Sequence, residues 1–219
     1  MLCSLFLLMC ACAAVAQQAP IPVDQEPHHH VVFKNDYVVV MRVNVPPGQS
    51  TLYHTHSHDR ASVDLSDSTI ARQEPGKPEG PPEETKPGNV SATALGSAPY
   101  THQVKNVGTR MFDVLDVEFL QRPGQPSAPA AAEVAAQNPS ARVYRWTLAP
   151  GAVSTMHTHQ RPYLIVSATP MMLKMTTPDG QSSSHEVKAG DFHWMDATVT
   201  HSLANAGTTE GQIVEIELK

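Results

Sequence analysis

Histidines recur at matching positions in the two halves of this 219-residue chain, and their spacing suits metal binding. Each half contains a His-Thr-His tripeptide and a later third histidine: His54, His56 and His102 in the first half, and His157, His159 and His201 in the second. Residues two apart on an extended strand point to the same face, so each tripeptide can present two imidazoles together. A third imidazole from a facing strand would complete a set of nitrogen ligands for a divalent metal and leave positions open for water or substrate.

The sequence around these histidines is repeated as well. MRVNVPPGQSTLYHTH (residues 41–56) aligns with YRWTLAPGAVSTMHTH (residues 144–159). HQVKNVGTRMFDVLDVEFL (residues 102–120) aligns with HSLANAGTTEGQIVEIELK (residues 201–219) at nearly the same separation. Two collinear blocks of this kind indicate a tandem duplication, so we expect the two halves to fold alike.

Short strands account for most of the remaining sequence. Segments 37–45 and 143–148 are apolar or β-branched and end at Pro and Gly, which is typical of strands. The Pro-Asp-Gly run at 178–180 predicts a hairpin turn, and the alternating segment 213–218 predicts a closing strand with one face in water. No window carries a long apolar stripe of helical period, so the sequence predicts an all-β protein of the sandwich or barrel type.

Composition predicts where the domains begin and end. We expect a first domain at 28–120, a Pro- and Ala-rich linker at 121–141 and a second domain at 142–219. Inside the first domain, the Pro-rich and charged stretch 73–88 predicts an exposed loop or hairpin end rather than a core strand. The net charge of -6 argues against a nucleic-acid partner.

Residues 1–16 have the features of a signal peptide, with a short apolar stretch that ends in small residues. The apolar stretch is too short to span a bilayer as a helix. All three cysteines, Cys3, Cys10 and Cys12, lie within residues 1–16. We therefore expect an exported protein, periplasmic or extracellular, whose mature form has no disulfide, thiolate nucleophile or sulfur-ligated metal. A lipid anchor at Cys12 and a free soluble form are both left open.

The motifs around the histidines resemble those of the cupin superfamily. That family's first motif is a glycine, five residues and His-x-His, and its second ends in a histidine, three residues and an asparagine. The matching residues are Gly48, His54, His56, His102 and Asn106 in the first half, and Gly151, His157, His159, His201 and Asn205 in the second. The resemblance implies a bicupin, which is an all-β protein of two tandem double-stranded β-helix (jelly-roll) barrels, and a metal in each functional barrel.

Two positions depart from the family pattern. Where the resemblance implies a glutamate ligand, the chain has Arg60 in the first half and Tyr163 in the second. The implied sites therefore have three histidines, or are completed by a neighbour such as His58. Arg60 would repel a metal cation, so the second half carries the cleaner prediction. As pocket residues, Tyr163 would donate a hydrogen bond, whereas Arg60 would clamp a carboxylate or pair with a surface aspartate.

Other residues invite chemical roles that we consider weaker than structural ones. The run His28–His30 predicts an exposed turn rather than ligands. The methionines at 171–175 are expected to fill strands rather than bind copper. On the strand before His201, we expect Trp194 to lie in the core and His193 in solvent.

These observations lead to one main hypothesis and two alternatives. The main hypothesis is an exported metal-binding bicupin that acts as a metal-dependent enzyme, dioxygenase- or isomerase-like, on a small oxygenated molecule. The metal would be Fe, Mn, Zn, Cu or Ni. The alternatives are a non-enzymatic module that binds a small ligand and a structural protein that forms homo-oligomers. No membrane span is expected, and no serine triad, phosphate loop or nucleotide fingerprint is present.

Overall fold

Strands make up nearly all of the structure, a computed structural model that describes residues 19–96, 98–121, 134–196 and 198–219. The predicted signal peptide and most of the predicted linker lie outside these residues. Among the described residues, no helix is long and apolar enough to cross a membrane. The elements are β1 (Ile21–Pro22), the 3-10 helix η1 (Val23–Gln25), β2 (His29–Lys34), β3 (Val38–Val45), β4 (His54–His56), β5 (Arg60–Asp64), β6 (Ser68–Gln73), β7 (Glu83–Thr85), β8 (Val90–Thr93), β9 (Tyr100–Asn106), β10 (Phe112–Phe119), β11 (Ala136–Gln137), β12 (Ala141–Leu148), β13 (His157–His159), β14 (Tyr163–Ser167), β15 (Met171–Thr176), β16 (Ser182–Val187), β17 (Phe192–Met195), β18 (Val199–Asn205) and β19 (Gly211–Leu218).

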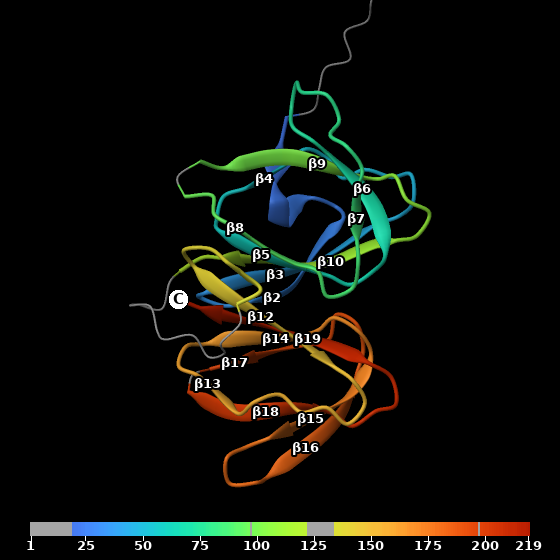
Figure 1. Ribbon diagram of the computed structural model, residues 1–219. Coiled ribbons are helices and arrows are strands. Elements are labelled where there is room, and N and C mark those ends of the chain that lie inside the picture. Colours follow the sequence, from blue (N-terminus) through green and yellow to red (C-terminus); the bar gives the residue numbers. More distant parts are fainter. Residues whose placement is uncertain (1–18, 97, 122–133, 197) are drawn as a thin grey trace, which may run out of the picture.

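The strands form two sheets in each half of the chain, and the two halves lie one above the other (Figure 1). In the first half the sheet orders are β1-β4-β9-β6-β7 and β2-β3-β10-β5-β8, and in the second half they are β11-β12-β19-β14-β17 and β13-β18-β15-β16. All pairs are antiparallel except β1 with β4. This confirms the predicted all-β class and the two jelly-roll barrels, which we call the first barrel (β1–β10) and the second barrel (β11–β19).

Turn residues fix the strand that carries each histidine pair. The chain turns at Gly48 (φ 76°) and at its repeat counterpart Gly151 (φ 77°), where a left-handed backbone favours glycine. Asn106 and Asn205 then tie these turns to the barrel, because each side-chain amide donates to two backbone carbonyl groups. The expected hairpin at 178–180 joins β15 to β16, with Gly180 at φ 83°.

The Pro-rich stretch 73–88 forms the end of a hairpin, as one of the two predicted forms. Glu83–Thr85 form the short strand β7 at the edge of a sheet, paired with β6. Only an edge strand suits so Pro-rich a segment, because proline cannot donate to a sheet ladder. At the far end of the predicted linker, Ala136–Gln137 form β11 against β12.

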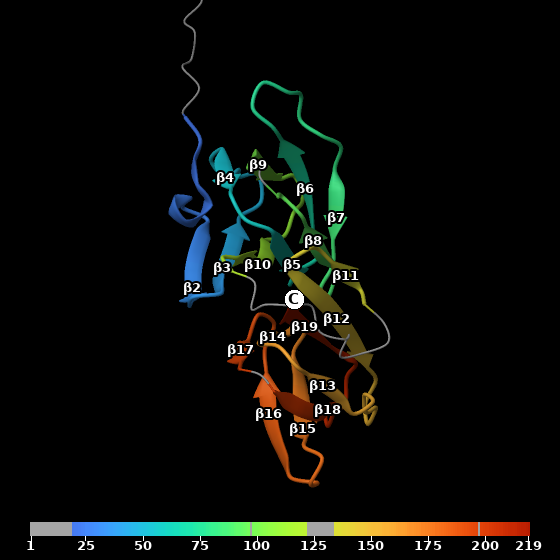
Figure 2. The ribbon, with the colours of Figure 1, turned by 90° about the vertical axis from the view of Figure 1, so that its left-hand side faces the viewer.

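The facing sheets of the two barrels share a single hydrophobic core. In Figure 2 the strands β12 and β19 of the second barrel lie on the side that faces the first barrel. The cluster combines Val38, Val40, Ala61, Val63, Leu65, Leu115, Val117 and Phe119 of the first barrel with Ala141, Val143, Leu164, Val166, Ala168, Val214, Ile216 and Leu218 of the second. At its edge, the indole of Trp194 stacks on Phe33 and Tyr37 with ring centroids about 6 Å apart. Trp194 therefore lies against the core as expected, while His193 is exposed.

Repeat-related arginines reinforce this contact in both directions. Arg42 of the first barrel donates to the carbonyl oxygen of Ala189 in the second (3.4 Å), and its counterpart Arg145 donates to that of Gly88 in the first (3.3 Å). Both acceptors lie in the corresponding turn of the opposite barrel. The duplication therefore produces an approximately two-fold contact in which each barrel reaches the same feature of the other.

The closing strand β19 is buried on both faces, so the prediction that one of its faces meets water was wrong. Val214, Ile216 and Leu218 point into the shared core between the barrels. Glu215 and Glu217 point to the other side, into the second barrel, and are fully buried. The alternation of apolar and acidic residues is real, but its acidic face meets buried histidines instead of solvent.

Because the two barrels share one core, truncating a core residue should weaken the whole molecule. Leu164, which is 1% exposed, packs in the shared cluster. We expect Leu164→Ala to lower the free energy of unfolding by about 2–5 kcal/mol through lost burial and a residual cavity. Val153→Ala, at a 63% exposed position, should change it by less than about 0.5 kcal/mol. Urea unfolding monitored by circular dichroism measures both, and comparable losses in the two variants would contradict the shared core.

Candidate metal centre

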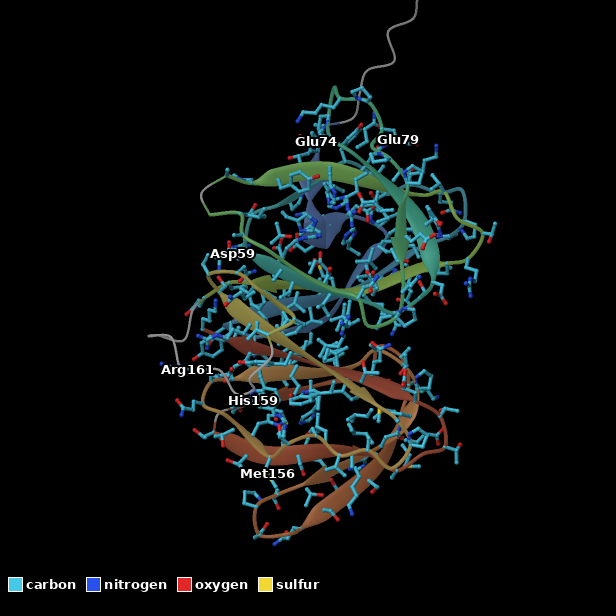
Figure 3. All side chains as sticks on the ribbon, in the orientation of Figure 1. Asp59, Glu74, Glu79, Met156, His159 and Arg161 are labelled. Atoms are coloured by element: carbon cyan, nitrogen blue, oxygen red, sulfur yellow. The ribbon has the colours of Figure 1, made fainter. Side chains whose placement is uncertain are left out.

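Three strands of the second barrel bring four buried side chains to one point. His157 and His159 come from β13, and His201 lies opposite His157 on β18. Glu215 comes from β19, and all four residues are at most 5% exposed. One nitrogen or oxygen atom from each lies within 4.8 Å of the others, so the group could hold a metal ion. Figure 3 shows His159 between the two sheets of this barrel.

Polar contacts at Nδ1 of the three rings leave Nε2 of each ring directed to this point. Nδ1 of His157 donates to the carbonyl oxygen of Thr155 (2.9 Å), which leaves the lone pair on Nε2. Nδ1 of His201 lies 3.2 Å from the hydroxyl of Tyr163, and Nδ1 of His159 lies 3.6 Å from the carboxylate of Glu217. Contacts of this kind fix ring orientation and tautomer around protein-bound metals.

Glu215 is the acidic partner of all three imidazoles. Its carboxylate oxygens lie 3.0, 3.4 and 2.8 Å from the Nε2 atoms of His157, His159 and His201, and one of them accepts a hydrogen bond from the indole of Trp146 (2.7 Å). Burial by itself raises the pKa of Glu215, but the imidazoles around it hold that pKa well below its ordinary value.

The buried carboxylate of Glu215 favours a positive charge where these four residues meet. Nε2 of His157 and Nε2 of His201 are only 2.9 Å apart, so either a hydrogen carried by one ring or a metal ion separates their lone pairs. Burial lowers the pKa of His159, yet the carboxylates of Glu215 and Glu217 raise it to about 9. Three imidazole nitrogens and one carboxylate oxygen, all buried, form a donor set that fits Fe, Mn or Zn.

The carboxylate of this group does not stand where the sequence motif predicts it. The motif implies a glutamate four residues after His159, where this chain has Tyr163. The Tyr163 ring stacks on His159 with centroids 3.8 Å apart, and burial raises the pKa of its hydroxyl. Tyr163 therefore packs against the imidazoles, and Glu215 is the carboxylate that lies beside them. The sequence does contain a sign of this carboxylate. Glu215 and Glu217 alternate with apolar residues along the closing strand, so both point to the same face of it, and that face is the inner one.

The first barrel also brings its predicted histidines together. His54 on β4 lies opposite His102 on β9, and the ring centroids of His54, His56 and His102 are 4.6–5.3 Å apart. A fourth ring joins them, because His29 lies 4.5 Å from His54 and is 7% exposed. The prediction of an exposed turn was therefore wrong for His29, which begins β2 and is bound to the buried carboxylate of Glu26.

Arg60 and His58 lie beside this second group of histidines. Nη1 of Arg60 is 3.1 Å from Nε2 of His56 and 2.9 Å from the carboxylate of Asp116. His58, with a side chain 42% exposed, lies 3.2 Å from the carboxylate of Glu118, which also accepts from His56. Arg60 thus pairs with a buried aspartate, rather than with the surface aspartates considered from the sequence.

Burial keeps two of the first barrel's histidines uncharged. It lowers the pKa of His54 to about 3, and it also lowers that of His102, with nearby cationic groups adding to the effect. For Asp116, burial works in the opposite direction and raises the pKa, but the guanidinium of Arg60 lowers it below its ordinary value. Arg60 and Asp116 therefore place a permanent cation and a carboxylate beside the uncharged rings of His54 and His102.

Removing the carboxylate of the second barrel should remove its affinity for metal. Glu215→Gln keeps the shape but loses the anionic ligand, so we expect bound metal to fall at least about tenfold. Metal retained after dialysis, measured by inductively coupled plasma mass spectrometry, tests this. Glu210→Gln, on an exposed loop, is the matched control and should retain metal. Equal retention in both variants would rule out Glu215 as a ligand.

Trp146 should report on metal in the second barrel. Its ring stacks on that of His157 at 4.9 Å, and the chain's other tryptophan lies in the contact between the barrels. Adding Mn²⁺ or Ni²⁺ to metal-free protein should quench Trp146 fluorescence. Trp194→Phe should keep the quenching, and Trp146→Phe should lose most of it. The reverse assignment would place the metal elsewhere.

No protein-family model matches the chain. The beta-alanine degradation protein BauB of Pseudomonas aeruginosa is 34% identical over 96 residues, which are 44% of this chain and 98% of that protein.

Solved structures match over both barrels. The cupin 2 conserved barrel domain protein of Leptotrichia buccalis covers 85% of this chain and 86% of its own (10% identity, TM-score 0.51). Salicylate 1,2-dioxygenase of Pseudoaminobacter salicylatoxidans covers 85% and 70% (11% identity, TM-score 0.55). Oxalate decarboxylase of Bacillus subtilis, described with Mn(II) centres, covers 84% and 69% (12% identity, TM-score 0.53). With two jelly-roll barrels, two buried histidine groups and a relative matched over nearly its full length, this chain belongs to the cupin superfamily.

Proposed function

We propose that this protein is a metal-dependent enzyme whose second barrel binds one divalent transition metal, Fe or Mn, and acts on a small oxygenated molecule. The observation that carries the proposal is the meeting of three imidazole Nε2 atoms and the Glu215 carboxylate beside a pocket. A metal bound there would supply Lewis-acid or oxygen-activating chemistry. The fold shared with salicylate 1,2-dioxygenase and with oxalate decarboxylase supports this reaction class by analogy only.

The pocket lies inside the second barrel and has a volume of about 480 Å³. It is lined by Ile165, Ser167, Leu173, Met175, Ser183, His185, Val187, Asp191, Phe192, His193, Met195 and Ile213. Ile213 is two residues from Glu215 on the inward face of β19, and Met195 lies opposite Tyr163 in the sheet. The four grouped residues do not themselves line the pocket, but these neighbours place the pocket next to the group within the same barrel, and its volume suits a small organic molecule.

The chemistry of the pocket wall suggests the kind of molecule that fits. Apolar side chains dominate it, and among the described lining residues there is no lysine or arginine. Asp191 and the nearby Glu215 would repel a second carboxylate on a substrate. The substrate we propose has a neutral apolar body and one or two oxygen atoms directed to the metal, rather than a small dicarboxylate.

Residues of the chain would hold and shield this substrate. The apolar wall excludes water, while His185 and His193 offer hydrogen bonds within the lining. The Tyr163 hydroxyl, 3.2 Å from Nδ1 of His201, keeps that ring in place. Glu217 holds His159 and accepts a hydrogen bond from the hydroxyl of Tyr144 (3.0 Å), so it orients the group without being needed as a ligand.

Metal content and turnover together test the proposal. Protein purified without a histidine tag should carry metal in the second barrel and consume oxygen or convert substrate within a panel of phenols, thiols and keto acids. His157→Ala should lose metal and activity together. Ile165→Trp, which fills the pocket, should keep the metal and lose turnover. Metal without any turnover but with ligand binding would favour the non-enzymatic alternative, and absence of retained transition metal would overturn the proposal.

We also propose that the protein is exported, on the strength of residues 1–16. Export predicts that the native mature protein begins near Gln17 and contains no cysteine. N-terminal sequencing and intact mass of protein from the native host test this prediction. A native chain that begins at Met1 would contradict it.

A further inference from the structure

The repeat allows the central groups of the two barrels to be compared position by position. His54, His56 and His102 correspond to His157, His159 and His201, and Asp116 corresponds to Glu215. Four residues after the second histidine, however, the first barrel has Arg60 where the second has Tyr163. We propose that the guanidinium of Arg60 takes the place of the metal ion in the first barrel, so that this barrel binds no transition metal while Arg60 is present.

Arg60 makes two of the contacts that a bound metal would make. Nδ1 of His56 donates to Glu118 (3.0 Å), so the lone pair of His56 is on Nε2. That lone pair accepts a hydrogen bond from Nη1 of Arg60 (3.1 Å). The same Nη1 lies 2.9 Å from the carboxylate of Asp116, the counterpart of Glu215. One cationic nitrogen thus joins the imidazole and the carboxylate that correspond to ligands in the second barrel.

The guanidinium is also difficult to displace. Arginine stays protonated at any physiological pH, so a metal ion beside it would meet an undiminished positive charge. The Arg60 side chain is 14% exposed and the Asp116 side chain 3%, so moving the arginine away would leave a buried carboxylate without this partner. A metal ion would have to replace Arg60 at both His56 and Asp116, while the positive charge of Arg60 repels it.

The other histidines of the first barrel do not form a separate complete site. His29, His54 and His56 lie close enough to hold a metal, but both nitrogens of His56 already have partners. Nε2 of His54 and both nitrogens of His102 have no hydrogen-bond partner among the described residues. They face a cavity of about 40 Å³, which has room for a few water molecules. We therefore assign this space to water.

Substitution of Arg60 tests the inference by metal stoichiometry. The experiment uses His157→Ala as background, which removes the site of the second barrel, and Mn²⁺ or Co²⁺ as probe. The background protein should bind no metal ion, and Arg60→Tyr, which copies the second barrel, should bind one per chain. Arg60→Met gives a second neutral variant in case tyrosine does not fit. Arg60→Lys keeps a cation and should bind none, as should Arg110→Tyr at an exposed site.

Mass spectrometry of retained metal and the Co²⁺ absorption spectrum give readouts that do not depend on activity. Folded Arg60→Tyr and Arg60→Met proteins that bind no metal would overturn the inference. So would a background protein that binds one ion and loses it on His54→Ala. This test is separable from that of the proposed function. A wild-type protein without bound metal would overturn the proposed function, whereas metal binding gained on replacing Arg60 would still support this inference.

Discussion

A buried carboxylate lies beside imidazole rings at the centre of each barrel, and much of the structure follows from its need for a cation. Asp116 is 2% exposed and Glu215 is fully buried, and a buried carboxylate is unfavourable unless a positive charge lies beside it. In the second barrel three imidazole Nε2 atoms surround Glu215, where a protonated ring or a metal ion supplies that charge. In the first barrel the guanidinium of Arg60 supplies the charge. The two centres are two solutions to one electrostatic constraint.

The strand β19 connects that constraint to the stability of the molecule. One of its faces supplies Ile216 and Leu218 to the core between the barrels, and the other directs Glu215 and Glu217 at the histidines. Because a strand buried on both faces has no freedom to shift register, the carboxylates are held where the imidazoles meet. The same geometry places Asp116 on β10 of the first barrel, beside Arg60.

Local spacing explains which parts of the fold and site could be predicted. The His-Thr-His pairs, the repeat and the Pro-Gly turns depend on neighbours in sequence, so the two barrels and six histidines were accessible. Glu215 was not, because alternation along a strand does not say whether its acidic face meets solvent or buried bases. His29 lies before the repeated blocks and becomes a neighbour of His54 only through the sheet. The partner of Arg60 was equally a product of tertiary structure, since Asp116 is 56 residues away.

The crossed contacts of Arg42 and Arg145 have a consequence for how the two centres could change over evolutionary time. Had the same surface joined two identical chains, every substitution would appear in both copies, and a change that excluded metal from one centre would exclude it from the other. Covalent duplication removes that coupling while keeping the symmetric contact. One barrel is then free to vary at its centre, because it is retained as the structural support of the other.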